Sequence, residues 1–243
     1  MKKNISKLGI IFILSLMVIA LFSSFAFALA TEKSGGTNAN VVLDGSGSSV
    51  METVFTKLGT SWPWYLTRAS GLVAGILMFI LILSGMGFIT GHAFNFLEPI
   101  TAWASHRALG IALGISLILH IGSLYFDSFV PFDVKSLFIP FASTYRPTTI
   151  LGFSVGSLYV ALGIFAFYIL LAVILTSLFW IDKKPKTWKF THLLSYLAMV
   201  LVFLHALYLG TDLTSGALRY IWIGLMLILA WAGIARLKRV GTV

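Results

Sequence analysis

Ionisable residues inside long apolar segments are the first candidates for chemistry in this 243-residue sequence. Four of the five histidines lie in such segments: His106, His120, His192 and His205. Ionisable side chains inside a membrane are costly, and they are functional candidates for that reason. A neutral imidazole is a common axial ligand of haem iron. Because the sequence contains no cysteine, disulfides, cysteine-bound iron–sulfur clusters and covalent haem attachment are excluded. The histidines therefore predict non-covalently bound haem.

The spacing of these histidines places them at two depths. His120 follows His106 by fourteen residues, which is about 21 Å along a helix, with the side chains about 40° apart around the axis. His205 follows His192 by thirteen residues, which is about 20 Å along the axis but about 140° around it. Two explanations of the second spacing are open: His192 precedes the regular helix, or the helix is locally tightened or kinked.

If both helices cross the membrane in the same direction, the histidines form two pairs. His106 and His192 then share one leaflet, and His120 and His205 share the other. Two pairs at two depths predict two haem b groups, each with two axial histidines, stacked along the membrane normal. The four histidines are thus expected to be iron ligands rather than acid–base catalysts.

Two glycines and the fifth histidine lie near the predicted ligands. Gly110 and Gly114 follow His106 on the same helix face. Small residues there either let a flat macrocycle approach the backbone or let two helices pack closely, and both interpretations stay open. His92, in the loop sequence GHAFNF, has no partner at its depth and is not expected to be a ligand.

Composition sets the fold class. Charged residues are 10% and hydrophobic residues 58% of the chain, whereas soluble domains carry about 25% charged residues. Apolar segments of about 20 residues cross lipid as helices, so the prediction is an all-α, polytopic membrane bundle. The net charge of +9 is spread over short clusters, so lipid and not nucleic acid is the expected partner. The five predicted spans are residues 65–89, 103–126, 151–181, 190–210 and 218–237.

The N-terminal part of the chain divides into two segments. Residues 1–30 carry three lysines, an apolar run and small-residue cleavage sites, which predict a signal peptide or, alternatively, a first transmembrane helix. Residues 31–60 are rich in Gly, Ser, Thr and Asn and predict a flexible extracytoplasmic linker. Residues 61–238 then form a di-haem membrane domain. The apolar loop 127–150 is expected to be a short amphipathic element over the outer face, or else a plain connector.

The distribution of Lys and Arg predicts the orientation. Eleven of the 17 fall at the two termini and in the loops 90–107 and 182–189, together with two acidic residues. The opposite side carries six, together with six acidic residues. The positive-inside rule therefore predicts a cytoplasmic C-terminus in the cell membrane. The pair containing His106 then lies in the inner leaflet, and the pair containing His120 in the outer leaflet.

Four stretches of the chain resemble the ferric reductase-like transmembrane domain, the haem-bearing core of ferric reductases and NADPH oxidases. They are WYLTRASGLVAGILMFILILSGM, HRALGIALGISLILHIGSLYFD, VPFDVKSLFIPFASTYRP and THLLSYLAMVLVFLHALYLGTD, within residues 64–237. The third stretch is most similar to small bacterial members without another domain. The resemblance implies the same inner pair, His106 with His192, and the same outer pair, His120 with His205.

The resemblance also implies a role for Arg68. An arginine there would lie beside the outer haem, where it could neutralise a propionate and attract an anionic acceptor; the alternative is an interfacial arginine that reaches the headgroups. Arg146 and Arg107 are weaker propionate candidates at the outer and inner faces. Oxidases have a histidine one turn after the outer ligand of the second helix, where this chain has Leu124. That departure puts superoxide production in doubt.

Together these features predict an oxidoreductase component. Electrons would pass through two haem b groups from a cytoplasmic-side flavoprotein or quinol to an external acceptor such as a ferric chelate. The chain ends shortly after Arg239, without a G-x-G-x-x-G motif behind a strand, so the donor is expected to be a separate protein. One alternative is a haem subunit that serves a dedicated partner enzyme, as in bacterial methionine-sulfoxide repair. A haem-free scaffold or transporter is the other, although depth-matched histidines disfavour it.

Overall fold

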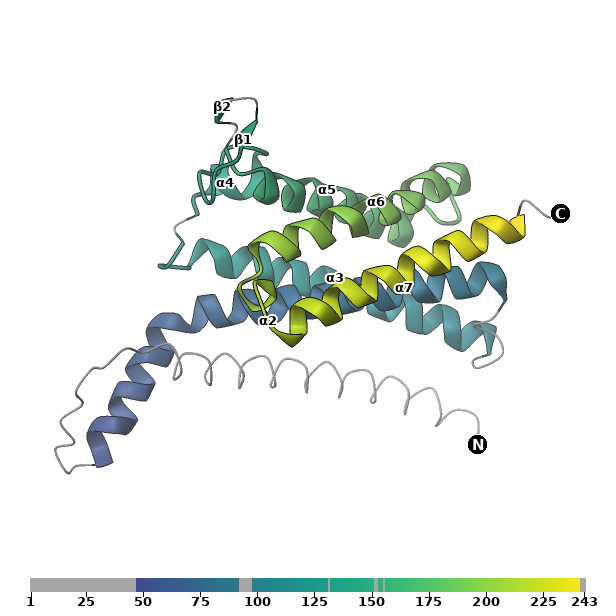
Figure 1. Ribbon diagram of the computed structural model, residues 1–243. Coiled ribbons are helices and arrows are strands. Elements are labelled where there is room, and N and C mark those ends of the chain that lie inside the picture. The colour runs from purple at the N-terminus through teal and green to yellow at the C-terminus, as the bar shows by residue number, and fades with distance from the viewer. Residues whose placement is uncertain (1–46, 92–97, 131, 151–152, 155, 241–243) are drawn as a thin grey trace.

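The fold is an all-α bundle, as the sequence predicts. The computed structural model describes residues 47–91, 98–130, 132–150, 153–154 and 156–240 (Figure 1). The predicted signal peptide lies outside the described residues. In chain order the elements are α2 Gly47–Thr90, α3 Pro99–Tyr125, α4 Val134–Phe138, β1 Thr149–Ile150, β2 Phe153–Ser154, α5 Leu158–Phe179, α6 Pro185–Leu209, the 3₁₀ helix η2 Thr211–Leu213 and α7 Ala217–Val240.

In the described part of the chain, five helices are long and apolar enough to cross a membrane, which confirms the predicted number of spans there and indicates a multi-pass membrane protein. These spans are Ser61–Thr90, Pro99–Tyr125, Leu158–Phe179, Pro185–Leu209 and Ala217–Ala235. Both α3 and α6 begin at a proline, which suits the first helical turn because the missing N–H would be unbonded there anyway. α5 begins later than predicted, since β1 and β2 pair just before it. Ser157 caps α5 by accepting a hydrogen bond from Val160 N–H.

The start of α2 corrects the predicted linker. Because α2 begins at Gly47, the segment 31–60 is helical from residue 47 onward and is not a flexible linker there. Although the segment is rich in Gly and Ser, it also contains apolar residues spaced at helical intervals. These residues are Val50, Met51, Val54, Phe55 and Leu58. In Figure 1 the first part of α2 projects beyond the bundle.

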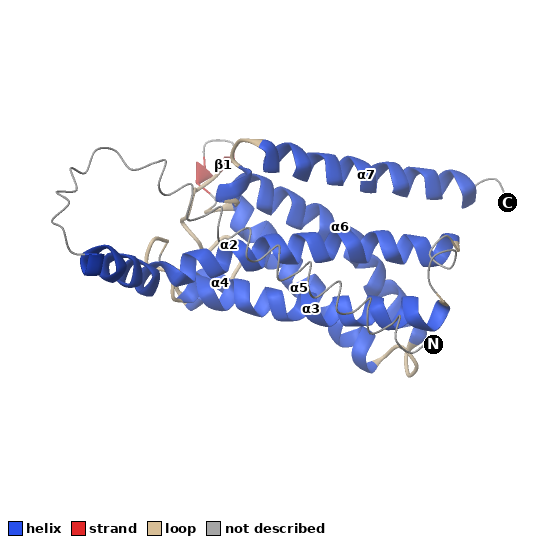
Figure 2. Ribbon diagram, turned by 90° about the horizontal axis from the view of Figure 1, so that it is seen from below, coloured by secondary structure: helices blue, strands red, loops and turns tan. Residues whose placement is uncertain are grey.

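Two helical hairpins form the bundle. α2 packs against α3, α5 packs against α6, and α7 lies against α2 and α6 (Figures 1 and 2). α2 supplies the largest share of the buried core, including Val73, Leu77, Met78 and Ile82. Large apolar residues such as Ile118 remain exposed on the outer surface, as expected of side chains that face lipid rather than water.

The two ends of the bundle differ in their connections. We call the end of the bundle where α2 leads to α3, and α5 leads to α6, the hairpin end. At the opposite end, which we call the loop end, α3 leads to residues 126–157 and α6 leads to η2. Asp133 caps α4 by accepting a hydrogen bond from Ser136 N–H (2.9 Å). Hydrogen bonding by the side chain and backbone of Ser136 holds the pKa of Asp133 below its ordinary value. Leu137 is buried whereas Val134 is exposed, so the loop contains a short amphipathic helix.

Candidate functional site

The four histidines of the apolar helices meet in two pairs. The ring centroids of His106 on α3 and His192 on α6 are 6.2 Å apart. Those of His120 and His205, on the same two helices, are 6.4 Å apart. The first is the hairpin-end pair and the second the loop-end pair. α6 is α-helical from Pro185 onward, so His192 does not precede the regular helix, which removes one of the two explanations of the thirteen-residue spacing.

Backbone carbonyls orient both rings of the loop-end pair. His120 Nδ1 lies 2.9 Å from the Thr67 carbonyl oxygen of α2. His205 Nδ1 lies 2.8 Å from the Tyr159 carbonyl oxygen of α5. Because a carbonyl oxygen can only accept, Nδ1 of each ring carries the hydrogen, and Nε2 of the neutral ring keeps its lone pair. Such a bond fixes the tautomer and the direction of a histidine that binds metal through Nε2.

At the hairpin-end pair, serine hydroxyls rather than backbone carbonyls lie next to the Nδ1 atoms. His106 Nδ1 lies 2.7 Å from Ser84 Oγ of α2. The Ser84 hydroxyl donates to a backbone carbonyl of its own helix at 3.0 Å, so its oxygen accepts from His106 Nδ1–H. His192 Nδ1 lies 3.4 Å from Ser177 Oγ of α5, and that oxygen accepts a hydrogen bond from Trp188 Nε1–H. All four Nδ1 atoms are therefore directed toward the first helix of a hairpin.

Two glycines make room for the rings of the loop-end pair. Gly71 and Gly163 each lie one turn after the carbonyl that accepts from His120 or His205. A Cβ atom added to Gly163 would lie 2.4 Å from His205 Nδ1. A Cβ atom added to Gly71 would lie 3.0 Å from His120 Nδ1. At Gly163, therefore, no side chain larger than a hydrogen fits unless the imidazole moves.

The glycines selected from the sequence have different surroundings. A Cβ atom at Gly110 would meet no atom within 4 Å, and the nearest atom to one at Gly114 would be Ile174 Cδ1 at 3.5 Å. Gly110 thus borders open space, whereas Gly114 faces α5 at ordinary contact distance. Sequence reasoning missed Gly71 and Gly163 because it considered only the helices that carry the histidines.

An internal similarity could have found the missed residues. In each hairpin the first helix supplies a carbonyl, a glycine one turn later and a serine farther along, and the second helix supplies two histidines. The sequence LTRASG at 66–71 matches LYVALG at 158–163 in three positions, including the glycine. The two hairpins are therefore alike in the order of the groups that contact the histidines and, to within one residue, in their spacing.

A cavity surrounds the loop-end pair. His120 and His205 line it together with residues from all five long helices and from the segment after α3. Trp222 of α7 is part of this lining, and its indole N–H donates to a backbone carbonyl of α6. Its ring packs on α2 at Gly75, where an added Cβ atom would lie 2.5 Å from the ring. The cavity is therefore walled mostly by apolar and aromatic side chains around two imidazoles.

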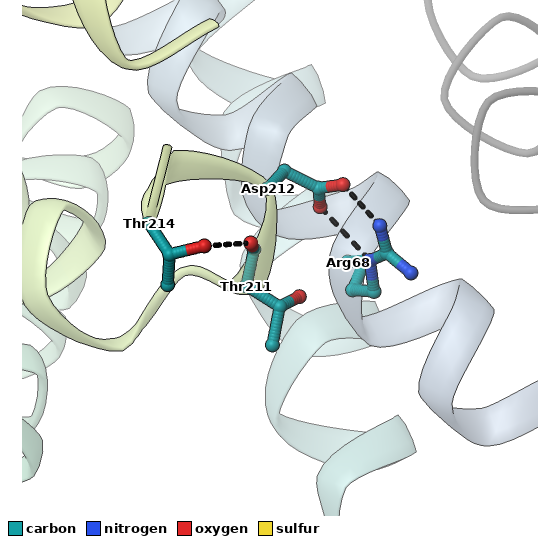
Figure 3. A network of polar contacts seen from close by, with 4 residues as sticks. All are labelled: Arg68, Thr211, Asp212 and Thr214. Carbon is teal, nitrogen blue, oxygen red and sulfur yellow. Dashed lines mark hydrogen bonds and ion pairs between the residues drawn. The ribbon is translucent and has the colours of Figure 1, made fainter. Parts of the chain in front are cut away.

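Arg68, predicted to lie beside the outer site, lines this cavity. Its guanidinium group binds Asp212 of η2 through two nitrogens: Nε donates to Oδ2 at 2.9 Å, and Nη2 donates to Oδ1 (Figure 3). The guanidinium carbon also lies 4.1 Å from the centroid of the Trp64 ring. Sequence reasoning did not identify Asp212 as the partner, because 144 positions separate it from Arg68.

The other two predicted arginines are not in the lining of this cavity. Arg146 is at the loop end, where its Nη1 donates to the Tyr208 carbonyl oxygen at 2.9 Å. Arg107 is exposed beside His106, and its guanidinium carbon lies 5.6 Å from the centroid of the Trp103 ring. Each lies at the end of the bundle to which the sequence assigns it.

Each histidine pair has the separation of two axial ligands. Two imidazoles that bind one metal ion from opposite sides, with metal–nitrogen bonds of about 2 Å, have ring centroids roughly 6 Å apart. The centroid distances of 6.2 and 6.4 Å fit that arrangement. In the described part of the chain, no three His, Cys, Asp or Glu residues gather as a metal site. Two facing imidazoles without a third ligand fit a haem iron, whose macrocycle supplies the other donors and which commonly takes histidine from the protein.

Comparison with known proteins gives a family match. Residues 70–203 match the family model described as "Ferric reductase like transmembrane component". The matched stretch contains three of the paired histidines and ends two residues before His205. No curated protein and no solved structure matches the chain. Members of this family are generally haem-binding, and the family suggests transmembrane electron transfer. Because the match covers more than half of its 243 residues, the chain belongs to the ferric reductase-like transmembrane family.

Proposed function

We propose that this chain carries electrons across the membrane through two haem b groups. His106 and His192 bind one haem, and His120 and His205 bind the other. The observation that carries the proposal is common to both pairs: the ring centroids have the separation of axial ligands, and every Nδ1 atom has a hydrogen-bonding partner. That arrangement leaves Nε2 available to iron. Bound haem supplies a one-electron iron couple, which these side chains lack.

The role of the protein is to hold the two sites apart in a dry interior. Fourteen residues separate His106 and His120 on α3, which places the two sites about 21 Å apart along the helix. Leu109 and Leu113, which lie between them on α3, are buried. The two sites then occupy the two leaflets and connect the faces of the membrane. Residues 61–238 form this di-haem unit.

We further propose which partners meet each end. The charge distribution places the hairpin end in the cytoplasm, where a separate flavoprotein or a membrane quinol donates electrons. The acceptor, for example a ferric chelate, is then reduced at the loop end outside the cell membrane. Leu124 lines the cavity one turn after His120, so an apolar side chain stands where an oxygen-reducing centre of the family has a histidine. Oxygen is for that reason not the proposed acceptor.

Purified protein is expected to contain two haem b groups per chain. Reduced-minus-oxidised spectra together with haem quantification on detergent-solubilised protein test this directly. His92→Leu is a matched control: His92, which lies outside the described residues, is not one of the four proposed ligands, so its replacement should leave the haem content unchanged. Protein that carries no haem after expression in haem-replete cells would contradict the proposal.

Ser84→Ala should change the midpoint potential of one haem and not the other. Loss of the Ser84 oxygen removes the acceptor of His106 Nδ1–H, which makes the imidazole a weaker donor to iron and favours the ferrous state. We expect the potential of that haem to rise by up to about 60 mV, the shift that a tenfold change in a one-electron equilibrium produces. Redox titration followed by absorbance measures it.

Thr176→Val is the control for the Ser84 variant. The Thr176 hydroxyl donates to backbone carbonyls of its own helix, so its loss should leave both potentials unchanged. Equal shifts of both haems in Ser84→Ala would show that the hydroxyl does not act through His106.

A further inference from the structure

We infer that the loop-end cavity favours uncharged or cationic electron acceptors, and that Asp212 is the residue that sets this preference. The inference rests on the proposed function, which makes the loop end the acceptor side. It reverses the expectation that Arg68 attracts an anionic acceptor. The argument depends on which charges line the cavity and on how they are paired.

The positive charge of Arg68 is compensated within the cavity wall. Two nitrogens of its guanidinium group bind the two carboxylate oxygens of Asp212 (Figure 3). Only 11% of the Arg68 side chain and 7% of the Asp212 side chain are exposed, so solvent and salt screen the pair weakly. Because a bidentate pair also has a fixed geometry, an approaching anion meets a guanidinium group whose charge is already neutralised.

A second carboxylate makes the lining negative. Asp127 lines the same cavity, is 7% exposed and accepts a hydrogen bond from Phe129 N–H at 2.9 Å. Within the described residues it makes no ion pair. The described lining thus contains two carboxylates and one guanidinium group. The excess charge near an acceptor is therefore negative.

Among the side chains that the structure describes, the remaining cations of the loop end do not line the cavity. Arg146 and Arg219 each donate to backbone carbonyls, and Lys135 is exposed on α4. Exposed charges are largely screened beyond about 10 Å at ordinary salt concentration. The carboxylates of the lining, which are buried and close to the reduced site, consequently dominate the local potential.

Comparison of the two hairpins shows that the Arg68–Asp212 ion pair is not needed to position a histidine. Val160 of α5 takes the place of Arg68 in the second hairpin. The histidine that α5 orients, His205, is nevertheless held by a carbonyl at 2.8 Å, as His120 is held at 2.9 Å. An ion pair at this position is therefore not required to orient a ring, so Asp212 can be replaced without removing a group that positions a histidine.

Electron transfer to two acceptors of opposite charge tests the inference. The haem-loaded full chain is reduced with dithionite and mixed in a stopped-flow instrument with ferricyanide, a trivalent anion, or hexaammineruthenium(III), a trivalent cation. In each case one electron passes from the reduced site to the acceptor, with no bond made and no proton moved. For the wild type, the rate constant for the cation should fall as ionic strength rises, and that for the anion should increase.

Asp212→Asn removes one negative charge from the lining. At low ionic strength we expect the ratio of the cation rate constant to the anion rate constant to fall about tenfold. Asp133→Asn is the matched control: Asp133 is exposed on the same face and does not line the cavity, and asparagine also caps helices well. Its ratio should equal that of the wild type.

The possible results separate this inference from the proposed function. An unchanged ratio in Asp212→Asn, or a wild-type preference for the anion that weakens with salt, would overturn the inference while the haem spectra uphold the proposed function. Should Asp212→Asn lose haem, Asp127→Asn makes the same charge change without touching Arg68 and must lower the ratio. Protein without haem would instead refute the proposed function.

Discussion

Replacing His120 with leucine should remove the same haem as replacing His205 with leucine. Haem b is held without a covalent bond, so an iron site that has lost one of its two axial ligands binds haem far more weakly. Each variant should retain about half of the wild-type haem, with one component left in a redox titration. Replacement of His106 or His192 should remove the other component, because the rings of those two residues face each other.

Double variants give this prediction its control. His120→Leu combined with His205→Leu should resemble either single variant, since both changes act on one site. His120→Leu combined with His106→Leu should lose both haems. If the component lost in His120→Leu were the one lost in His192→Leu, the pairing read from the structure would be wrong even though haem binds.

Gly163→Ala should have nearly as large an effect without altering any ligand. The added Cβ atom would lie 2.4 Å from His205 Nδ1 and 2.6 Å from Cε1, so the ring must leave its position and its bond to the Tyr159 carbonyl. Loss of such an orienting partner typically weakens metal binding by about 10–100-fold. We expect the loop-end haem to be lost, or to dissociate much faster, as measured by haem content and by haem transfer to an apoprotein acceptor.

Other glycines of the same bundle provide a graded control. Gly71→Ala places Cβ 3.0 Å from His120 Nδ1, a contact that a shift of a few tenths of an ångström relieves, so its effect should be smaller. Gly224→Ala on α7 meets no atom within 4 Å and lies outside the cavity lining, so it should leave both haems in place. A Gly224 effect as large as that of Gly163 would mean that general helix packing, rather than the shape of the His205 slot, governs haem retention.

The sequence predicts those features that depend on local composition and spacing. Runs of apolar residues predict the five spans, because each helix must satisfy its own backbone in lipid. The pairing of His106 with His192 follows from depth, since rise per residue converts sequence distance into position along a membrane helix. Ideal-helix angles fail for His192 and His205, which lie about 140° apart by calculation yet both face histidines of α3.

Other features depend on contacts between helices and could not be predicted in the same way. The space that His205 occupies beside Gly163 exists because α5 packs against α6 there. Residue spacing within one helix does not predict where it contacts another helix. The pairing of Arg68 with Asp212 joins α2 to η2 across 144 positions. The helical start of α2 is a different case: its apolar residues do recur at helical intervals, and composition was given too much weight there.

Because the two hairpins are alike, one hairpin present in two copies could supply all the groups of a di-haem site. Each hairpin contributes one histidine and one partner of a histidine Nδ1 to both pairs. In each hairpin the first helix leads to the hairpin end and the second leads back from it. Duplicating one hairpin about a two-fold axis along the membrane normal would therefore recreate all eight groups. A symmetric dimer of a single designed hairpin, with a carbonyl and glycine above and a serine below, contains the complete set of axial ligands for two haems. The last helix, α7, belongs to neither hairpin and carries none of the four histidines; its Trp222 covers part of the cavity instead.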